Sequence, residues 1–383
     1  MNKNTLENGP IRSHFLDMAP PNFPPTEADV RERYGFSGPI RRLHLNECPY
    51  PPAPGVVAAI ANAAVTMNRY PDPRCRTLRA ALARRTKLDV DHIVVGNGSA
   101  QLIHLLALAT LDEDSEAVMP APSYPGYIAA CHIIGAKAIR VPLRDDGAND
   151  VAGLVEAITE RTRILFCTPV NNPTGGMLGG DDFDHLIGHI PDRVLLVMDD
   201  AYHEFAIQAG GLDVLPSIKK RTGPWAVLRT FSKAYGLAGV RIGYGLFGST
   251  DIAETIYKAR SKFEINAIAL AAATAALEDN EYRDRILDEC ANQRQRLADG
   301  CTDLGLRPMP SVANYITVRL PANGQDTAKI LAQRGIIVSP LAAPGYDDCI
   351  RITIGLSEDI DAVLAELTNL FGSGVKTSNS QEI

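Results

Sequence analysis

The sequence predicts an α/β protein in which a large domain, with a mostly parallel sheet covered by helices, precedes a smaller α+β domain. Between about residues 66 and 262, short β-branched runs alternate with amphipathic helical patterns, which is typical of a parallel sheet buried on both faces. From about residue 263 the pattern changes to long helices followed by shorter strands. We therefore expect an N-terminal arm (1–45), a large domain (46–262), a small C-terminal domain (263–372) and a disordered tail (373–383).

Short apolar runs mark the strands of the large domain. They lie at 93–95, 117–119, 138–141, 164–167, 194–199, 226–229 and 241–247. Helical patterns occupy the intervals, for example at 77–85, 100–108 and 151–158. In sheets of this kind ligands bind at the carboxyl ends of the strands, so the polar residues that follow each run are the candidates for a site.

The small domain begins with two helical patterns and continues with three strand candidates. The helices are expected at 266–277 and 282–304, and the strands at 315–319, 336–339 and 350–354. A last amphipathic helix follows Ser357, which we interpret as its N-cap, with Ile360, Val363, Leu364 and Leu367 along one face. The Pro-rich first 45 residues are interpreted as an arm that lies over other elements. The polar run after Phe371 predicts a disordered tail.

Composition and charge argue against several classes of partner. The chain has 383 residues and a net charge of -7, which disfavours nucleic acid or an anionic membrane. The longest apolar stretch, 265–277, is too short to span a bilayer, and the first residues lack the apolar core of a signal peptide. The seven cysteines are scattered, with no CxxC pair. These features predict a cytoplasmic protein with reduced thiols and no metal.

A polar loop follows the strand that ends at Arg229. It contains Ser232 and Lys233 and leads to Arg241. A lysine that forms an imine must be desolvated or placed among cations, because its intrinsic pKa of about 10.4 keeps it protonated. Ser232 and Arg241 could supply a grip on a phosphate. Taken alone the signal is weak, since a lysine near a turn is more often a solvated surface charge.

Two further strands end in polar residues. Asp199 and Asp200 close an apolar run, and a carboxylate there could be a metal ligand, a base or the partner of a protonated ring nitrogen, although Asp200 could equally be a helix N-cap. Asn171 and Asn172, flanked by prolines, form a rigid loop that presents amides in a fixed direction.

Small residues and an aromatic follow the first two strands. The turn at 96–101 lets backbone amides and a helix N-terminus approach a phosphate. It is not the dinucleotide fingerprint, because Gln101 stands at the last glycine position, and no GxxxxGK[ST] loop is present. Tyr124 lies just after the next strand, where it could stack on a planar ring.

Taken together, these elements resemble the fold-type I, pyridoxal-phosphate-dependent aminotransferases, most closely the histidinol-phosphate aminotransferase-like branch. The likeness covers residues from about 44 to 370 and rests on nine motifs in family order. They are 45–47 (LNE), 69–72 (RYPD), the turn at 96, 122–124 (PSY), 171–175 (NNPTG), 199–202 (DDAY), 232–233 (SK), 239–241 (GVR) and 349–355 (CIRITIG).

The resemblance implies the cofactor, pyridoxal 5'-phosphate, and the residues that contact it. Lys233 would bond to its aldehyde and later move a proton, Asp199 would keep the ring nitrogen protonated, and Tyr202 would hydrogen-bond the phenolic oxygen. These three would be the catalytic residues. The implied cofactor-binding set is Ser99, Ala100, Tyr124, Asn172, Asp199, Tyr202, Ser232, Lys233, Arg241 and Tyr70.

The resemblance also implies the substrate contacts and the assembly. Arg351 would hold the substrate carboxylate, with Asn172 and Tyr50 as further substrate contacts. Tyr70 is similar to a tyrosine that reaches the cofactor of the neighbouring subunit, which implies a homodimer with shared active sites. The expected reaction moves an amino group from an amino acid or histidinol phosphate to a 2-oxo acid, 2-oxoglutarate first among them, by a ping-pong mechanism in amino-acid biosynthesis.

Departures from the branch bear on the substrate. Ser339 stands where the family usually has an arginine that grips a distal anion, so the donor could instead be an unphosphorylated aromatic, imidazole or cationic amino acid of secondary metabolism. Lys262 and Glu264 are also unusual, and an acid there could disfavour a dianionic substrate, whereas Lys262 could restore the lost charge.

The sequence is also compatible with three other functional classes. A decarboxylase or lyase of the same fold would differ only in which bond of the substrate is set perpendicular to the ring. A metal-dependent hydrolase is suggested by His185 and His189 at helical spacing, without an HExxH glutamate or an obvious third ligand. A catalytically silent pyridoxal-phosphate-binding protein is disfavoured by the joint presence of Lys233, Asp199 and Arg351.

Overall fold

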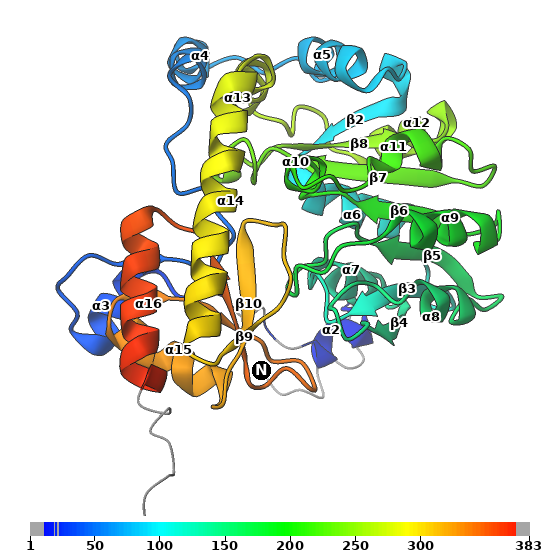
Figure 1. Ribbon diagram of the computed structural model, residues 1–383. Coiled ribbons are helices and arrows are strands. Elements are labelled where there is room, and N and C mark those ends of the chain that lie inside the picture. The colour runs from blue at the N-terminus through cyan, green and yellow to red at the C-terminus, as the bar shows by residue number, and fades with distance from the viewer. Residues whose placement is uncertain (1–10, 19, 21–22, 373–383) are drawn as a thin grey trace, which may run out of the picture.

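The large part of the chain is built around a seven-stranded sheet. The computed structural model describes residues 11–18, 20 and 23–372 (Figure 1). The strands follow the order β2-β8-β7-β6-β5-β3-β4, and all are parallel except β8, which runs antiparallel to both of its neighbours. Their bounds are β2 (Ile93–Gly96), β3 (Glu116–Ala121), β4 (Lys137–Pro142), β5 (Thr162–Cys167), β6 (Leu195–Asp199), β7 (Trp225–Thr230) and β8 (Gly243–Phe247). The predicted mostly parallel sheet is therefore confirmed.

Helices cover both faces of this sheet, which explains why its inner strands are mostly apolar, whereas the edge strand β4 is largely exposed or half-buried. Successive side chains of a strand point to opposite faces. On β6, Leu196 and Met198 pack with α5 (Arg76–Thr86), α8 (Val151–Glu156) and α9 (Gly180–His189). Leu195 and Val197 pack on the other face with α6 (Gly98–Thr110), α7 (Gly126–Ile134) and α12 (Thr250–Ala259). The shorter α10 (His203–Gln208) and α11 (Val214–Ile218) belong to the first of these cores.

The C-terminal part combines long helices with a small antiparallel sheet. The sheet has the order β12-β13-β10-β9, formed by β9 (Arg307–Pro308), β10 (Tyr315–Arg319), β12 (Ser339–Pro340) and β13 (Cys349–Thr353). Its helices are α13 (Ala267–Glu278), α14 (Asn280–Asp303), α15 (Gly324–Gln333) and α16 (Ser357–Phe371). The expected α+β character is confirmed.

The single strand predicted at 336–339 is in fact two strands in different sheets. β11 (Ile336–Ile337) pairs in parallel with β1 (Arg41–Arg42), whereas β12 pairs with β13. The chain changes partner at Val338. β12 is an edge strand, the place in a sheet that tolerates its proline.

Two predicted boundaries also differ. Arg241 adopts a left-handed backbone (φ +58°) after a 3-10 turn, so β8 begins only at Gly243. Ser357 is the first residue of α16 and not its N-cap. The N-cap is Leu356, whose N–H donates to Asp359 Oδ2 (3.0 Å), while the Ser357 hydroxyl accepts from Arg296 (2.9 Å).

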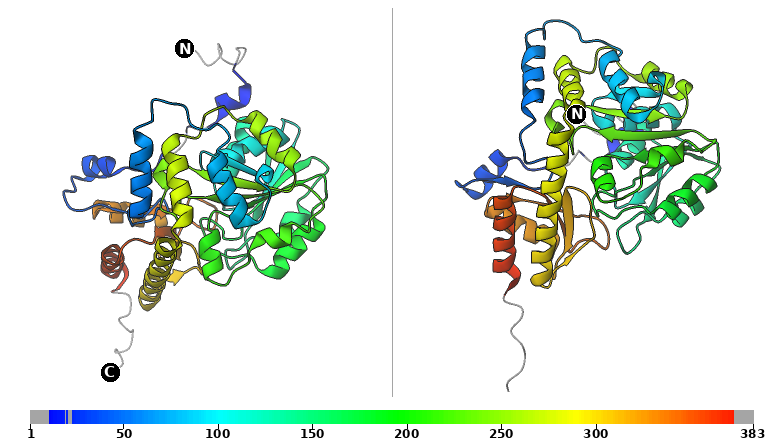
Figure 2. Two further views of the ribbon diagram at one scale, coloured as in Figure 1. Left: turned by 90° about the horizontal axis from the view of Figure 1, so that it is seen from above. Right: turned by 45° about the horizontal axis from the view of Figure 1, so that its top comes forward.

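The segment before the large sheet touches both parts of the molecule. α2 (Ser13–Asp17) contacts α7, and α3 (Glu27–Tyr34) contacts α15. Figure 2 shows α4 (Pro54–Ala64) lying beside α13, and the two helices pack along their length. The described part of the predicted arm therefore contacts α7 through α2 and α15 through α3. The predicted disordered tail, 373–383, lies outside the described residues, and the domain boundaries stay a prediction.

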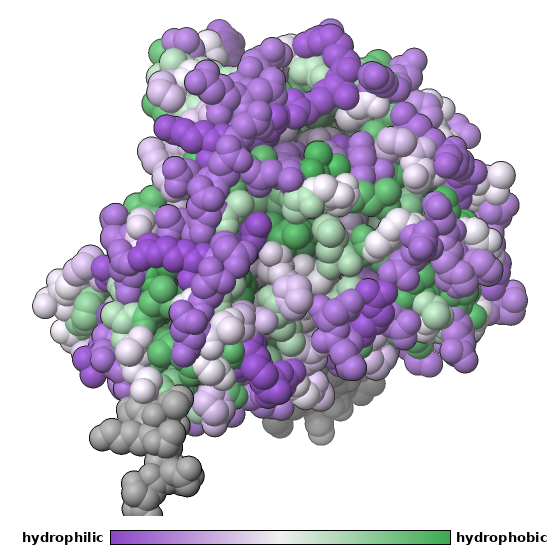
Figure 3. Space-filling view, viewed as in Figure 1, coloured by the Kyte–Doolittle hydropathy of each residue, from purple (hydrophilic) through white to green (hydrophobic). Residues whose placement is uncertain are grey.

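The described residues include no helix suited to cross a membrane. None of their helices combines the length and the apolar character that a bilayer crossing requires. On the face seen in Figure 3, hydrophilic residues cover most of the outer helices, and paler or apolar residues lie in the middle.

Candidate active site

A cavity of about 520 Å³ opens at the carboxyl ends of the parallel strands, facing β13. It brings together residues that are far apart in the sequence, as expected for this kind of sheet. Of the residues predicted for the site, those that line it are Ser99, Ala100, Tyr124, Asn172, Asp199, Tyr202, Ser232, Lys233, Arg241 and Arg351. Tyr70 and Tyr50 do not line it.

Lys233 lies in the loop after β7, where it is half-buried and lines this cavity. Nζ donates to the backbone carbonyls of Leu45 (3.1 Å) and Asn46 (3.0 Å). The pKa of the amine is lowered to about 7, chiefly by burial and also by the nearby Arg351 guanidinium, while Glu47 opposes the shift. A substantial fraction of the amine is therefore unprotonated near neutral pH, which is the form that can attack an aldehyde.

Asp199 ends β6 and is 7% exposed. Tyr127 donates a hydrogen bond to its Oδ2 (2.8 Å), whereas its Oδ1 is buried without a partner. Burial raises the pKa of this carboxyl to about 6. A buried carboxylate oxygen without a donor is costly, so a protonated nitrogen placed against Oδ1 would satisfy it and keep the group ionised.

An anion cradle forms around the first turn of α6. Ser99 and Ala100 occupy this turn, and Arg241 approaches it, donating to Ser232 Oγ (3.4 Å) and to the Ala238 carbonyl (3.0 Å).

Two glycines make this close packing possible. A Cβ on Gly98 would come within 2.7 Å of Arg241 Nη2, and one on Gly243 within 2.5 Å of the Ser99 nitrogen. Because the N-terminus of a helix attracts anions, this arrangement fits a phosphate.

Three further predicted residues shape the cavity walls. Tyr202 is 4% exposed, accepts a hydrogen bond from Asn46 Nδ2 (2.9 Å), and keeps its proton because burial raises the pKa of its phenol to about 12. Tyr124 lies edge-on to Tyr127, with ring centroids 5.6 Å apart. Asn172 accepts a hydrogen bond from Arg351 through its Oδ1.

The two asparagines of the 171–175 loop have separate roles. Asn171 is buried, donates to Thr174 Oγ1 (2.7 Å) and accepts from Ser123 (2.8 Å). Its bonds hold the loop, while Asn172 alone lines the cavity.

Arg351 lies on β13, opposite the sheet that carries Lys233. Its Nη2 donates to the His44 carbonyl (2.6 Å), its guanidinium lies over the Tyr315 ring (5.6 Å), and its Nε is buried without a partner. Burial lowers the pKa of Arg351. A buried guanidinium with a free donor suits a carboxylate ligand. Ser339 is its partner across the strand pair β12–β13 and lines the same cavity.

Neighbouring charged residues turn out to be compensated inside the chain. Asp200 accepts from Arg229 Nε (2.9 Å) and is not an N-cap, since α10 is capped by Tyr202. Glu264 pairs with Arg260 (2.7 Å) and accepts from Gln101 (2.8 Å), so the free acid expected at this position has a counter-charge within the chain. Lys262 is exposed.

Tyr70 and Tyr50 lie away from the cavity of their own chain. Tyr70 is 82% exposed and stacks on Phe263, with ring centroids 4.6 Å apart. Tyr50 is half-buried and lines a small void with Cys48 and Cys290, and Lys233 lines both this void and the cavity.

Sequence reasoning missed three residues of the site. Asn46 and Glu47 line the cavity, as does Tyr127. Asn46 and Glu47 belong to the 45–47 motif, to which the sequence assigns no role. Tyr127 lies in the first turn of α7, and its contact with Asp199 has no local signal in the sequence.

The histidine pair considered as a metal site forms no such site. His185 and His189 stack at 4.0 Å, and His189 Nδ1 contacts the His185 carbonyl (2.9 Å). Within the part of the chain that the structure describes, no group of three or more His, Cys, Asp or Glu side chains could hold an ion.

One cavity is lined by a lysine amine, a buried carboxylate with one free oxygen, an anion cradle and a tyrosine ring. This set of groups defines a pyridoxal-phosphate-dependent enzyme. The residues present fit that cofactor. The chain belongs to the aminotransferase class I and II family, whose sequence profile matches residues 40–367.

Individual relatives agree with this assignment. Histidinol-phosphate aminotransferase 1 of Mesorhizobium japonicum is 32% identical over 94% of this chain and 98% of its own length. An aromatic amino acid aminotransferase of Thermobifida fusca is 36% identical over 93% and 96%. The crystal structure of histidinol-phosphate aminotransferase from Sinorhizobium meliloti in complex with pyridoxal-5'-phosphate superposes with a TM-score of 0.87 at 27% identity, covering 96% of this chain and 99% of that one.

These findings confirm the predicted family, the fold, the enzymatic character, transamination as the reaction, and pyridoxal 5'-phosphate as the cofactor. The roles of individual residues stay predictions.

Proposed function

We propose that this aminotransferase takes the amino group from an amino acid or histidinol phosphate and gives it to a 2-oxo acid, 2-oxoglutarate, in a ping-pong cycle. The observation that carries the proposal is the convergence of Lys233, Asp199 and Arg351 on one cavity. Each supplies a different requirement of the reaction: a movable proton, a charge for the ring nitrogen, and a clamp for a carboxylate. A cytoplasmic, biosynthetic role belongs to the same proposal.

The cofactor is held by residues of the large sheet. When bound, pyridoxal phosphate supplies an aldehyde and an electron-withdrawing ring that stabilises negative charge on the donor's α-carbon. Asp199 Oδ1, the buried oxygen without a partner, would accept the ring N–H. The residues that would hold the phosphate are Ser99, Ala100, Ser232 and Arg241. Tyr124 would pack against the ring, and Asn172 and Tyr202 would bind its phenolic oxygen.

Lys233 moves the proton. With a pKa near 7 its amine can accept a proton from the donor's α-carbon and can release it again within the same pH range. Arg351 orients the donor, because a carboxylate bound at its unpartnered Nε fixes the α-carbon relative to Lys233.

An unphosphorylated aromatic or cationic amino acid is the alternative donor. Ser339 faces Arg351 across β12–β13, where it offers a hydroxyl and no charge. The aromatic amino acid aminotransferase of Thermobifida fusca, at 36% identity, supports an aromatic donor. Arg351 then remains for the donor's own carboxylate.

Replacing this serine tests the donor class. Ser339→Arg should raise kcat/KM for histidinol phosphate and lower it for an unphosphorylated aromatic donor, because it adds a cation next to Arg351. The ratio of the two kcat/KM values should change by about tenfold or more, the effect of a charge-assisted hydrogen bond. An unchanged ratio would rule out the specificity role of this position.

We further propose a homodimer with shared active sites. Apolar side chains after α4 are left exposed on the single chain: Val65 (81%), Met67 (62%) and Tyr70 (82%). An exposed apolar patch of this kind is suited to an interface. Tyr70, which does not reach its own cavity, would contribute to the cavity of the second subunit.

An absorbance spectrum tests the proposal directly. The purified protein should show the absorbance band of bound pyridoxal phosphate. This band should decay when a suitable donor is added and return when 2-oxoglutarate is added. Lys233→Ala should abolish turnover while the protein keeps its far-UV circular dichroism. A folded Lys233→Ala protein with the wild-type rate would overturn the assignment.

A further inference from the structure

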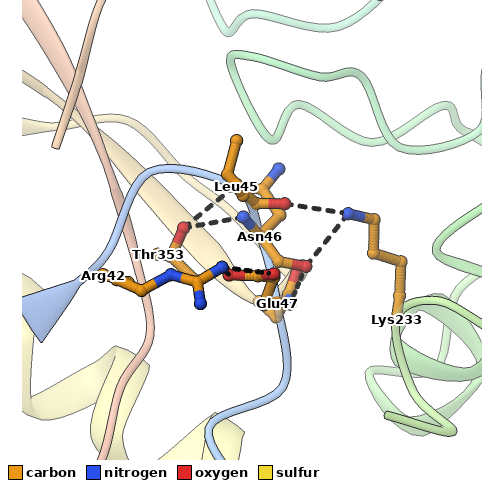
Figure 4. A network of polar contacts seen from close by, with 7 residues as sticks. Arg42, Leu45, Asn46, Glu47, Lys233 and Thr353 are labelled. Atoms are coloured by element: carbon orange, nitrogen blue, oxygen red, sulfur yellow. Dashed lines mark hydrogen bonds and ion pairs between the residues drawn. The ribbon is translucent and has the colours of Figure 1, made fainter. Parts of the chain in front are cut away.

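A buried asparagine, Asn46, lies between the residues that follow the large sheet, Lys233 and Tyr202, and the strand β13. Asn46 is 2% exposed, and each of its polar groups is hydrogen-bonded. Its N–H donates to Thr353 Oγ1 (2.9 Å), and its Oδ1 accepts from the same hydroxyl (3.2 Å) (Figure 4). Its Nδ2 donates to the Tyr202 phenol (2.9 Å), and its carbonyl accepts from Lys233 (3.0 Å) and from Asn314 (3.0 Å).

The backbone of Asn46 brings two carbonyls to one nitrogen. Its φ of +54° is left-handed, whereas in an extended chain successive carbonyls point in opposite directions. The turn at Asn46 lets the carbonyls of Leu45 and Asn46 both accept from Lys233 Nζ, at 3.1 and 3.0 Å. Figure 4 shows both contacts. The conformation of Asn46 therefore decides where the free amine of Lys233 rests.

Asparagine is the residue type that meets both requirements. Asparagine, aspartate and glycine enter the left-handed region most readily. Of these, asparagine alone presents one side-chain donor and one acceptor. Aspartate has no donor for the Tyr202 phenol, and glycine has no side chain.

The same segment runs along the strand that carries Arg351. Thr353 N–H donates to the Leu43 carbonyl (2.8 Å), and Arg351 donates to the His44 carbonyl (2.6 Å). Arg351 and Thr353 are two residues apart on β13, so their side chains lie on one face of the strand. Asn46 thus connects that face of β13 to the amine of Lys233 and the phenol of Tyr202.

We propose that Asn46 is a positioning residue that fixes the free amine of Lys233 and the phenol of Tyr202 relative to Arg351. The inference rests on the proposed function, in which Lys233 moves a proton on a donor whose carboxylate Arg351 holds. Because proton transfer depends steeply on the donor–acceptor distance, loosening Asn46 slows that step while the contacts of Arg351 with the donor remain.

Two variants test the proposal, and two others serve as controls. Asn46→Asp keeps the left-handed conformation but removes the donor to Tyr202, and Thr353→Val removes the hydroxyl that anchors Asn46. Thr353→Ser keeps that hydroxyl and should behave as wild type. Thr327→Val removes a buried hydroxyl on α15 that bonds only to the Asn323 carbonyl (3.0 Å), so it controls for loss of a buried hydrogen bond.

The first measurement is the single-turnover rate with a donor and with its α-deuterated form. Both test variants should lose about tenfold or more in this rate, with a larger deuterium isotope effect and little change in donor affinity. The second measurement needs no donor: the rate at which apo-protein captures pyridoxal phosphate, followed against pH. In Thr353→Val, which adds no charge, the midpoint should move to lower pH, because a loosened Asn46 no longer holds its carbonyl against the ammonium form of Lys233.

A merely structural role would lower the melting temperature and leave the isotope effect and the pH midpoint unchanged, which would contradict the proposal. If one test variant does not fold, the other decides, with Thr353→Ser as its rescue. If the wild type itself responds to no donor, the proposed function fails, while the pH midpoint of aldehyde capture still decides the role of Asn46.

Discussion

Two adjacent carboxylates at the end of β6 have opposite surroundings. Asp200 is 2% exposed and paired with Arg229, which also reaches Asp213 (3.1 Å). Asp199 has a hydrogen bond from Tyr127 but no cation in contact, and burial raises the pKa of its carboxyl to about 6. One carboxylate therefore supports the fold, and the other is held ready for a ligand at a cost in stability.

This contrast predicts opposite stability effects for two isosteric substitutions. The pKa of Asp199 is higher in the folded than in the unfolded chain, so its ionisation destabilises the apo-protein as pH rises from about 4 to about 6, and the cost persists above that range. Asp199→Asn should stabilise the apo-protein at pH 8 by up to about 3 kcal/mol, and by much less at pH 4. Asp200→Asn should destabilise it by about 2 kcal/mol, because the buried Arg229 then keeps only the partly exposed Asp213 as its counter-charge. Urea unfolding at both pH values measures the two effects. A destabilising Asp199→Asn at pH 8 would show that this carboxylate is structural.

At the scale of residues, the sequence predicted those that follow a strand and missed those that depend on tertiary approach. Lys233 and Asp199 come directly after apolar runs, so their place at the sheet edge follows from the topology. Asn46 meets Tyr202 across 156 positions, and Tyr127 meets Asp199 across 72. No local pattern encodes such contacts.

The first turn of α6 is tied to the loop that follows α12. Gln101 accepts from the Asn97 N–H (2.7 Å) and donates to Glu264 (2.8 Å), and Asn97 donates to the Glu264 carbonyl (3.2 Å). Glu264 also pairs with Arg260, and the two side chains are 10% and 3% exposed. This buried network fixes the turn that carries Ser99 and Ala100.

Glu264→Gln tests this element. It leaves the buried Arg260 without a counter-charge and should cost about 2 to 3 kcal/mol of unfolding free energy. It should also weaken the binding of pyridoxal phosphate, because the α6 turn loses its anchor. Glu254→Gln is the matched control, since Glu254 forms an exposed pair with Lys258 on α12 (69% and 72% exposed), worth less than about 1 kcal/mol. Urea unfolding and a cofactor titration compare the two. Equal effects would show that the network does not support the cradle.

Elements were predictable where burial imposes a period on the sequence. The strand at 315–319 was predicted to the residue, because it is apolar and buried along most of its length. The sequence predicts a single strand at 336–339, although β11 and β12 belong to two sheets, because both strands are short and are separated only by Val338. Arg241 was assigned to a strand because its left-handed backbone depends on packing against the α6 turn, not on its own preference.

At the scale of the whole molecule, the single chain leaves one predicted contact unmade. Tyr70 is 82% exposed and supported by Phe263, with Val65 and Met67 exposed nearby in the sequence. The side chain projects from its own subunit and does not line its cavity. The resemblance of the 69–72 motif implied a role for Tyr70 in a second copy of the chain, and that role stays a prediction.

Mixing two defective subunits tests whether the sites are shared. In a dimer of one Lys233→Ala and one Tyr70→Phe subunit, the site with an intact Lys233 would receive its Tyr70 from the other chain, so one of the two sites would be complete. Random reassembly of equal amounts would place half of the chains in such mixed dimers and restore about a quarter of wild-type activity. If Tyr70 served its own subunit, each site would carry at most one intact partner and mixing would restore nothing.

Light scattering establishes the dimer beforehand, and a mixture of Lys233→Ala with Lys233→Ala controls for reassembly. A monomeric protein with full activity would overturn the shared-site proposal, because Tyr70 could then be replaced without loss.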